Sequence, residues 1–346
     1  MLGKRSGIWV VATWAIVSAV WPARAVEPVT SEPFTAVEVQ RYTDLDVKKI
    51  QELTNEDLAD YVRLRARDLA LRPERPRPGD EIGHYAMQAL GQPYRIKSWR
   101  HDLTEVDCVT FQERCIALAL AVDWRSYHLL TDRIRHKDGD ARFAARNVYP
   151  LADWVPSNAW LFEDVTAKLG VPAATFDLEV ERRKRALADI RAGYVAPAEV
   201  NVETVPEVEW LSQTYVASEH IYDALPALRT GDLAFVIHAR RLPGRPLKQF
   251  CDHVGILVRD ESDLVTFVHA APPQVRQEYM LNFLERCPWV SGFKFLRLRD
   301  NARELVTAEL ERTGAGKSVP APADQDSTNR TLRQSRGLEL RAVDKQ

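Results

Sequence analysis

Residues 252–270 have the sequence DHVGILVRDESDLVTFVHA, and this stretch indicates the class of fold. Two short runs rich in β-branched and aromatic residues flank a polar turn, 260–263. This pattern predicts an antiparallel β-hairpin. The start of one hairpin strand lies beside the end of the next, so we expect His253 and His269 to be neighbours at one sheet edge.

Helical patterns dominate the first half of the chain, and strand patterns dominate the second. The segments with helical patterns are 55–71 after the cap Thr54, 80–90 after Asp80, 108–122, 125–135, 157–169 and the highly charged 179–193. Strand runs at 233–237 and 293–298 accompany the hairpin. Helices that mostly precede the strands are typical of an α+β fold.

The first 25 residues have the features of a secretory signal peptide. Lys4 and Arg5 precede an apolar run, 8–21, and the sequence Pro-Ala-Arg-Ala follows at 22–25. The run is shorter than the roughly 20 residues that a membrane span needs, although an uncleaved anchor is the alternative. We therefore expect cleavage after Ala25, a periplasmic or secreted protein, and no membrane span in the mature chain.

Prolines and polar stretches divide the remaining sequence. Residues 26–78 are expected to form a linker, to about 45, and then a helical segment whose Arg65 and Arg67 lie on a solvated face. Three prolines in 73–78 mark a boundary. Residues 79–300 form the predicted catalytic domain, and the polar residues 301–346 a predicted disordered tail.

The overall composition excludes several classes of protein. The chain has 346 residues, of which 45% are hydrophobic and 28% charged, as in an ordinary globular protein. The 47 Lys and Arg residues against 49 Asp and Glu give a formal charge of −2, which provides no attraction to nucleic acid. Four cysteines are too few for a disulfide-dominated scaffold.

Cys108 is the candidate nucleophile because it begins an apolar helix. Free N–H groups and the partial positive charge at a helix N-terminus favour a thiolate and bind a developing oxyanion. Asp107 is a candidate N-cap, although its charge opposes the thiolate. A Cys108 packed against the hairpin edge would meet His253 and His269, which predicts a Cys–His–His set. An inert buried cysteine and two half-buried histidines are the alternative.

Several short motifs then appear in a recognisable order. They are Gly91-Gln92-Pro93-Tyr94, Asp107-Cys108, the run 228–235 with Gly231-Asp232, Asp252-His253-Val254-Gly255-Ile256 and Val268-His269-Ala270. Together they resemble the NlpC/P60 superfamily of cell-wall cysteine peptidases. The segments 146–150 and 153–154 are similar to its DUF1460, N-acetylmuramoyl-L-alanine amidase-like branch. The resemblance covers about residues 80–300.

This resemblance implies a papain-like α+β core, with the Cys108 helix packed on an antiparallel sheet and extra helices before it. It implies that Cys108 is the nucleophile, His253 the general base and acid, and His269 the residue that orients His253. Tyr94 and Asp107 are expected at the oxyanion or substrate site, with a core tyrosine as the alternative for Tyr94. One departure is Asp252, where the family often has Ser or another small residue.

The expected function is a secreted cell-wall cysteine amidohydrolase acting on peptidoglycan or muropeptides. The candidate bonds in the stem peptide are MurNAc–L-Ala and γ-D-Glu–diaminopimelate. An acyltransferase on the same fold and a non-catalytic wall-binding module are the alternatives. No CxxC or HExxH spacing occurs, so neither a metal nor another cofactor is predicted.

Two further expectations concern residues outside the motifs. Among the remaining cysteines, Cys251 and Cys287 are the more plausible disulfide pair, because Cys115 follows Cys108 along one apolar helix. His238 lies in a strand run but belongs to no motif, so it is expected to be unimportant for the chemistry.

Overall fold

A computed structural model of the chain describes residues 32–96, 104–240 and 248–314; the predicted signal peptide lies outside them. The helices are α1 (Ala36–Asp46), α2 (Asn55–Leu71), α3 (Pro78–Gln88), α4 (Cys108–Leu120), α5 (Trp124–Arg135), α6 (Val155–Ser157), α7 (Arg182–Arg191), α8 (Ile221–Ala224), α9 (Met280–Arg286) and α10 (Ala302–Gly314). The strands are β1 (Phe162–Asp164), β2 (Ala174–Val180), β3 (Glu209–Ala217), β4 (Leu233–Arg240), β5 (Lys248–Arg259), β6 (Val265–Ala271), β7 (Gln274–Tyr279) and β8 (Val290–Leu298).

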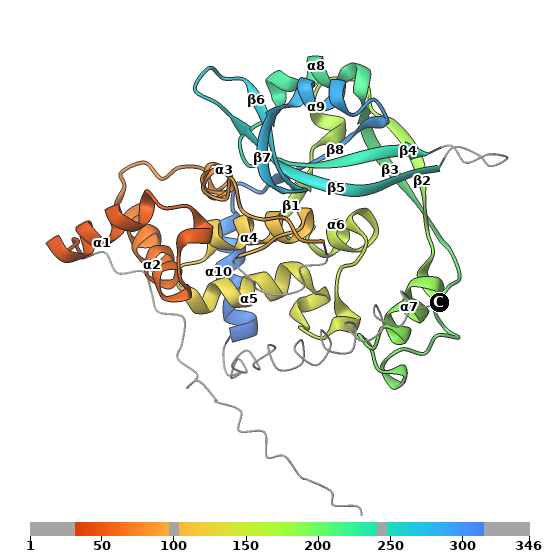
Figure 1. Ribbon diagram of the computed structural model, residues 1–346, viewed down its shortest axis with the longest axis horizontal. Coiled ribbons are helices and arrows are strands. Elements are labelled where there is room, and N and C mark those ends of the chain that lie inside the picture. The colour runs from red at the N-terminus through yellow and green to blue at the C-terminus, as the bar shows by residue number, and fades with distance from the viewer. Residues whose placement is uncertain (1–31, 97–103, 241–247, 315–346) are drawn as a thin grey trace, which may run out of the picture. The chain divides into compact units, whose positions relative to one another are not determined.

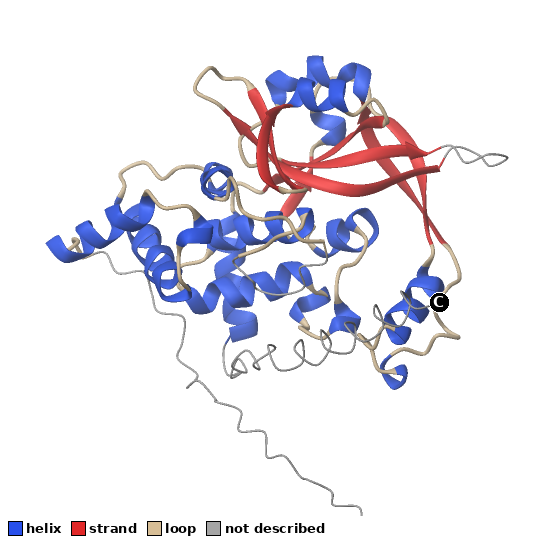
Figure 2. Ribbon diagram, viewed as in Figure 1, coloured by secondary structure: helices blue, strands red, loops and turns tan. Residues whose placement is uncertain are grey.

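The strands form one antiparallel sheet in the order β2-β3-β8-β4-β5-β6-β7, and β1 pairs with β8. Helices and strands are combined but largely segregated along the chain, as the α+β pattern predicts (Figure 2). The hairpin of β5 and β6 is confirmed, with Ile256 opposite Val268 and Val258 opposite Thr266. Its turn is the predicted polar segment, 260–263.

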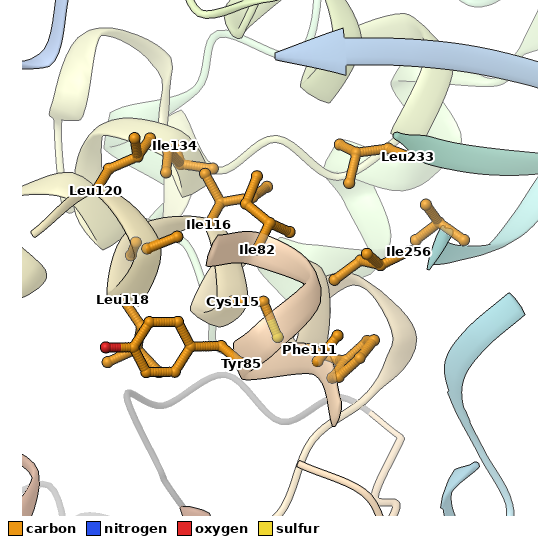
Figure 3. Close-up of a cluster of buried hydrophobic side chains, with 14 of the residues drawn as sticks. Ile82, Tyr85, Phe111, Cys115, Ile116, Leu118, Leu120, Ile134, Leu233 and Ile256 are labelled. Carbon is orange, nitrogen blue, oxygen red and sulfur yellow. The ribbon is translucent and has the colours of Figure 1, made fainter. Parts of the chain in front are cut away.

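The two faces of this sheet are buried by different helices. Helices α3 and α4 pack against one face, and α8 and α9 cover the other (Figure 1). The alternation along β5 explains this, because Val254 and Ile256 point to the α4 side whereas Leu257 points to the α9 side. Figure 3 shows the core on the α4 side, where side chains from α3, α4 and α5 meet Leu233 and Ile256.

Helix α4 occupies the centre of this core. It begins at Cys108, as predicted, and nearly all of its residues are buried. Cys115 lies two turns from Cys108 and is fully buried, and Figure 3 shows it between α3 and Phe111. The buried helix therefore holds its N-terminus, and Cys108 with it, in a fixed position against the sheet.

The N-terminal helices differ from their prediction. The expected linker contains α1, which begins with a capping box between Thr35 and Glu38. Arg65 of α2 is buried rather than solvated and makes a 2.7 Å ion pair with Glu81 of α3. Arg67 is buried as well and lies over the ring of Phe34. These arginines join α1 and α2 to the rest of the core.

Three other predictions are corrected by the structure. The expected helix over 157–169 is replaced by the short helix α6 and by β1, because residues 162–164 pair with β8 instead of continuing a helix. Asp80 lies in the first turn of α3, which begins two residues earlier. The expected disordered tail begins with α10, which buries Ala302, Val306 and Leu310; residues 315–346 lie outside the described part.

Among the described residues, no helix is both long enough and apolar enough to cross a membrane.

Candidate active site

The N-terminus of α4 is fixed by a reciprocal cap. The Asp107 carboxylate accepts a 2.8 Å hydrogen bond from the Thr110 backbone N–H, and the Asp107 N–H donates to the Thr110 hydroxyl at 2.9 Å. Asp107 is therefore the N-cap that the sequence predicts. Cys108 follows as the first helical residue and is 8% exposed. Its thiol lies where the free N–H groups of a helix converge.

The thiol of Cys108 lies against an irregularity in β5. On the neighbouring strand β4, Val236 pairs with His253 and Ile237 pairs with Cys251, so Asp252 has no partner. Asp252 is thus the extra residue of a β-bulge. Its free carbonyl oxygen accepts a hydrogen bond from the Cys108 thiol, with the sulfur and oxygen 3.8 Å apart. The bulge places the thiol directly beside the strand position of His253.

His253 and His269 are in direct contact, as the hairpin predicts. The Nε2 atom of His253 lies 2.7 Å from Nδ1 of His269, and His269 is almost completely buried. The Nε2 atom of His269 lies 2.8 Å from Oε1 of Glu278 on β7. Phe283 of α9 stacks on the His253 ring and meets the His269 ring edge-on. These packed rings hold His253, His269 and Glu278 in line.

The direction of these hydrogen bonds follows from Glu278. An ionised carboxylate can only accept, so Nε2 of His269 carries the proton and Nδ1 of that ring accepts from Nε2–H of His253. The Nδ1 atom of His253 then keeps its lone pair. It makes no hydrogen bond to any residue that the structure describes. The three residues together, which we term the relay, therefore present an unprotonated nitrogen on His253.

Two arginines surround the end of the relay. Arg286 donates to both oxygens of Glu278, at 2.6 and 3.1 Å. Arg276 Nε lies 3.3 Å from His269 Nε2 and 3.5 Å from Glu278 Oε1. Since Nε2 cannot donate to the carboxylate and accept from Arg276 together, we assign the shorter, charge-assisted contact as the hydrogen bond. Burial acts to raise the pKa of Glu278, but hydrogen bonds from Arg286 and His269 lower it overall.

Burial and charge keep the reacting groups neutral at rest. Burial, and next the charge of His269, lower the pKa of His253 to about 3. Burial also lowers the pKa of His269 to about 4, against the opposing effect of Glu278. Burial raises the pKa of Cys108 to about 12, and the charges of Asp107 and Asp252 contribute. Near neutral pH the site therefore holds a thiol and a neutral imidazole.

The structure does not join Cys108 to His253 by a hydrogen bond. Within the described residues, the thiol donates to the Asp252 carbonyl instead. The His253 ring packs with Phe267 and Phe283, which belong to the core on the α9 side, whereas Cys108 belongs to the core on the α4 side. Proton transfer between the two side chains thus requires the thiol to turn away from the carbonyl.

Tyr94 is placed close to this thiol. Its backbone N–H donates to the Pro273 carbonyl at 2.9 Å, and the neighbouring Pro93 accepts from Val106 just before α4. Burial raises the pKa of Tyr94 to about 12, and the negative charge at Cys108 makes the next largest contribution. Tyr94 is therefore a half-buried side chain that packs against the core on the α4 side and lies within electrostatic reach of the sulfur.

His238 lies nearer to the site than its lack of a motif suggests. Its Nε2 atom is 3.1 Å from Oδ1 of Asp252, the bulge residue, although the two are not aligned as a hydrogen bond. Its charge also contributes to the lowered pKa of His253. That His238 is unimportant for the chemistry stays a prediction, although the residue lies next to the bulge.

The predicted disulfide between Cys251 and Cys287 is absent, and both cysteines are free. Cys287 belongs to the core on the α9 side of the sheet, whereas Cys251 packs against the core on the α4 side. The sheet lies between them, so their side chains cannot bond without a change of register.

Glu278 is the site residue that sequence reasoning missed. It lies on β7, whose sequence QVRQEY is mostly polar, with Val275 its only buried residue. Such an edge strand gives little hydrophobic alternation. The available signal was position, because a strand that follows the Val268-His269-Ala270 strand after a short turn pairs with it.

Comparisons with known proteins give a consistent picture. A family model described as N-acetylmuramoyl-L-alanine amidase-like (AmiA-like) matches residues 83–285. A Legionella pneumophila protein of the DUF1460 family has a similar fold, with a TM-score of 0.59 and 15% identity over 70% of this chain and 95% of its own. An N-acetylmuramoyl-L-alanine amidase from Bacteroides uniformis gives a TM-score of 0.52 and 18% identity over 64% and 99%. No curated protein matches the sequence significantly.

Proposed function

Because the chain belongs to the N-acetylmuramoyl-L-alanine amidase-like family, we propose that it hydrolyses an amide bond in the peptide stems of peptidoglycan, with Cys108 as nucleophile. The relay carries this proposal. Glu278 and His269 set the tautomer of His253 and leave its Nδ1 unprotonated, and Cys108, at a helix N-terminus, hydrogen-bonds to the carbonyl of Asp252, the residue before His253. A nucleophile, a base and a group that orients the base are the components of covalent acyl transfer.

The proposed reaction begins with the thiol turning from the Asp252 carbonyl toward His253. His253 takes the thiol proton as the sulfur attacks the amide carbonyl carbon, and a tetrahedral oxyanion forms. The imidazolium then donates this proton to the leaving amine, and an acyl-thioester remains on Cys108. Water attacks the thioester with His253 as base, which releases the carboxylic acid and restores the thiol.

Two groups support the oxyanion in this proposal. The backbone N–H groups at the start of α4 lie beside the sulfur, since Cys108 is the first residue of the helix. The Tyr94 hydroxyl, whose raised pKa keeps its proton near neutral pH, is the second donor. Oδ1 of Asp107 accepts both the backbone N–H and the hydroxyl of Thr110, so the proposed contribution of Asp107 is to position Cys108.

We extend the proposal to the class and location of the enzyme. The motifs around Cys108, His253 and His269 support a papain-like core of the NlpC/P60 type and a cysteine peptidase mechanism. The predicted signal peptide supports export to the periplasm or beyond. Between the two candidate bonds, the family description favours MurNAc–L-Ala over γ-D-Glu–diaminopimelate.

Digestion of purified peptidoglycan tests this function. The wild-type protein should release new termini that mass spectrometry assigns to one of the two bonds, and Cys108→Ala should release none. Addition of EDTA should leave the rate unchanged, because the proposed chemistry uses only side chains. Full activity of Cys108→Ala, or loss of activity with EDTA, would contradict the mechanism.

A further inference from the structure

Asp252 is the bulge residue of β5 and directly precedes His253. Its carbonyl oxygen accepts a hydrogen bond from the Cys108 thiol, whereas its side chain is 57% exposed. The bulge therefore turns this carboxylate toward solvent at the reacting sulfur. A β-bulge beside an active site commonly redirects one side chain in this way.

The negative charge of Asp252 affects the titratable groups around Cys108. Burial is the main cause of the raised pKa values of Cys251, Cys108 and Tyr94, and the charge of Asp252 is a further cause in each case. Asp107 also contributes at Cys108 and Tyr94. Because the Asp252 carbonyl lies 3.8 Å from the Cys108 sulfur, the carboxylate of the same residue lies close to any group that is bound next to the thiol.

Within the described part of the chain, no lysine or arginine forms an ion pair with Asp252, and its one ion-pair neighbour there is His238, at 3.1 Å. Burial lowers the pKa of His238, so this imidazole is neutral near neutral pH. An exposed carboxylate with no described cationic partner therefore remains next to the residue that Cys108 contacts.

Such a charge opposes the reaction unless the substrate neutralises it. Acylation requires negative charge on the sulfur and then on the oxyanion, and a nearby carboxylate disfavours both. A small neutral residue at this position would carry no such penalty. A substrate with a positive group at Asp252 removes the penalty and gains a charge-assisted hydrogen bond.

We propose that Asp252 binds an ammonium group of the substrate beside Cys108, and that this contact selects peptides with a free amine close to the cleaved amide. The inference rests on the proposed function. In a peptidoglycan stem the amine is either the side chain of the diamino acid or the N-terminus of a released peptide, and the two share the same chemistry.

Binding to the inactive Cys108→Ala protein tests the proposal without turnover. The probes are the peptide L-Ala–γ-D-Glu–L-Lys and three matched forms, acetylated on the N-terminus, on the lysine side chain, or on both. We expect one single acetylation to weaken binding about tenfold, as loss of a charge-assisted contact does, and so to identify the amine. Asp252→Asn should weaken binding of the free peptide similarly and leave the doubly acetylated form unchanged.

A second measurement compares the rates at which positively and negatively charged reagents modify Cys108. Methanethiosulfonate reagents with cationic or anionic heads form a mixed disulfide with Cys108 and release a sulfinate. Trypsin cleaves after Arg100 and Arg114, so the peptide 101–114 reports Cys108 apart from the other cysteines. The ratio of cationic to anionic rates should fall about tenfold in Asp252→Asn. Asp223→Asn, which removes an exposed carboxylate on α8, is the matched control and should not change the ratio.

The outcomes separate the two proposals. Equal binding of all four peptides by Cys108→Ala would overturn the role of Asp252 and leave the proposed function intact. Failure to bind any of them would overturn this inference, whereas digestion of peptidoglycan by the wild-type protein decides the proposed function separately. An unchanged rate ratio in both Asp252→Asn and Asp252→Ser would show that the carboxylate does not act on the thiol.

Discussion

The Nε2 atom of His269 lies 2.8 Å from Oε1 of Glu278, so a carboxylate on the edge strand β7 sets the protonation of both histidines. Replacing this carboxylate by an amide removes that control, because an amide donates as readily as it accepts. The consequence should appear in turnover rather than in binding.

We therefore expect Glu278→Gln to lower kcat by about 10- to 100-fold, with little change in KM. General acid–base assistance is typically worth about 10²–10⁴-fold, and an orienting group supplies part of it. Glu285→Gln, at an exposed position on α9, is the matched control and should keep the wild-type rate. A Glu278→Gln enzyme with unchanged kcat would show that the relay does not orient His253.

Cys108 and His253 should behave as one catalytic unit. Either Cys108→Ala or His253→Ala should remove nearly all turnover, and the double variant should be no worse than the single ones. The reason is that a thiol without a base and a base without a thiol are equally unable to form the acyl-thioester. Initial rates on peptidoglycan for the three variants check this, and strictly multiplicative losses would mean that the residues act separately.

Alkylation of the free protein should follow the titration of a lone thiol. With the pKa of Cys108 raised to about 12 and that of His253 lowered to about 3, both groups are neutral between these values. The rate with iodoacetamide at Cys108 should therefore rise continuously from about pH 6 to about pH 9. A plateau across neutral pH would reveal a preformed thiolate–imidazolium pair instead.

Acid should destabilise the fold through its buried histidines. Burial lowers the pKa of His84 and of His269 to about 4, against about 6.5 in an unfolded chain. Between pH 4 and pH 6.5 the unfolded chain binds more protons than the folded protein does, so the free energy of unfolding falls as the pH drops below about 6.5. Urea midpoints near neutral and at about pH 5 measure this loss. His84→Gln should show a smaller loss than wild type, and an equal loss would exclude His84 as a source.

Helix α10 should be needed for stability. A chain that ends at Asp300 lacks Val306 and Leu310, which are buried, and the 2.5 Å ion pair between Glu309 and Arg133 of α5. Burial of two such side chains contributes about 3–5 kcal/mol, so thermal unfolding should occur at a clearly lower temperature. A chain ending at Gly314 keeps the helix and is the control. Equal melting temperatures for the two chains would contradict this role.

The sequence predicted those parts of the site in which local pattern and pairing agree. The short β-branched and aromatic runs on both sides of the polar turn at 260–263 predicted a hairpin, and so predicted that His253 and His269 would meet. The cap Asp107 and the apolar run after Cys108 likewise predicted the start of α4. In each case a few neighbouring residues determine the geometry.

Other parts depend on contacts between distant segments. Glu278 escaped notice because β7 is polar and gains its position from pairing with β6. Residues 302–314 contain no aromatic residue, so their sequence is typical of a disordered tail. The ion pair between Glu309 and Arg133 of α5, which holds the helix in place, joins segments that are far apart in the sequence. Asp252 shows the same limit, since a bulge depends on the registers of two strands and not on the residue itself.

The bulge at Asp252 weakens the regular backbone hydrogen bonding of the sheet next to Cys108. Its interruption of the β4–β5 ladder coincides with a second shift of register, between Ile237 and His238 where β4 meets β8. Fewer regular hydrogen bonds protect the backbone here than farther along β5, so amide protons near the bulge exchange with solvent through smaller fluctuations. Cys108, the proposed nucleophile, begins a buried helix but faces this interrupted stretch of the strand. The backbone beside the sulfur can therefore adjust to a bound peptide while the core around α4 stays closed.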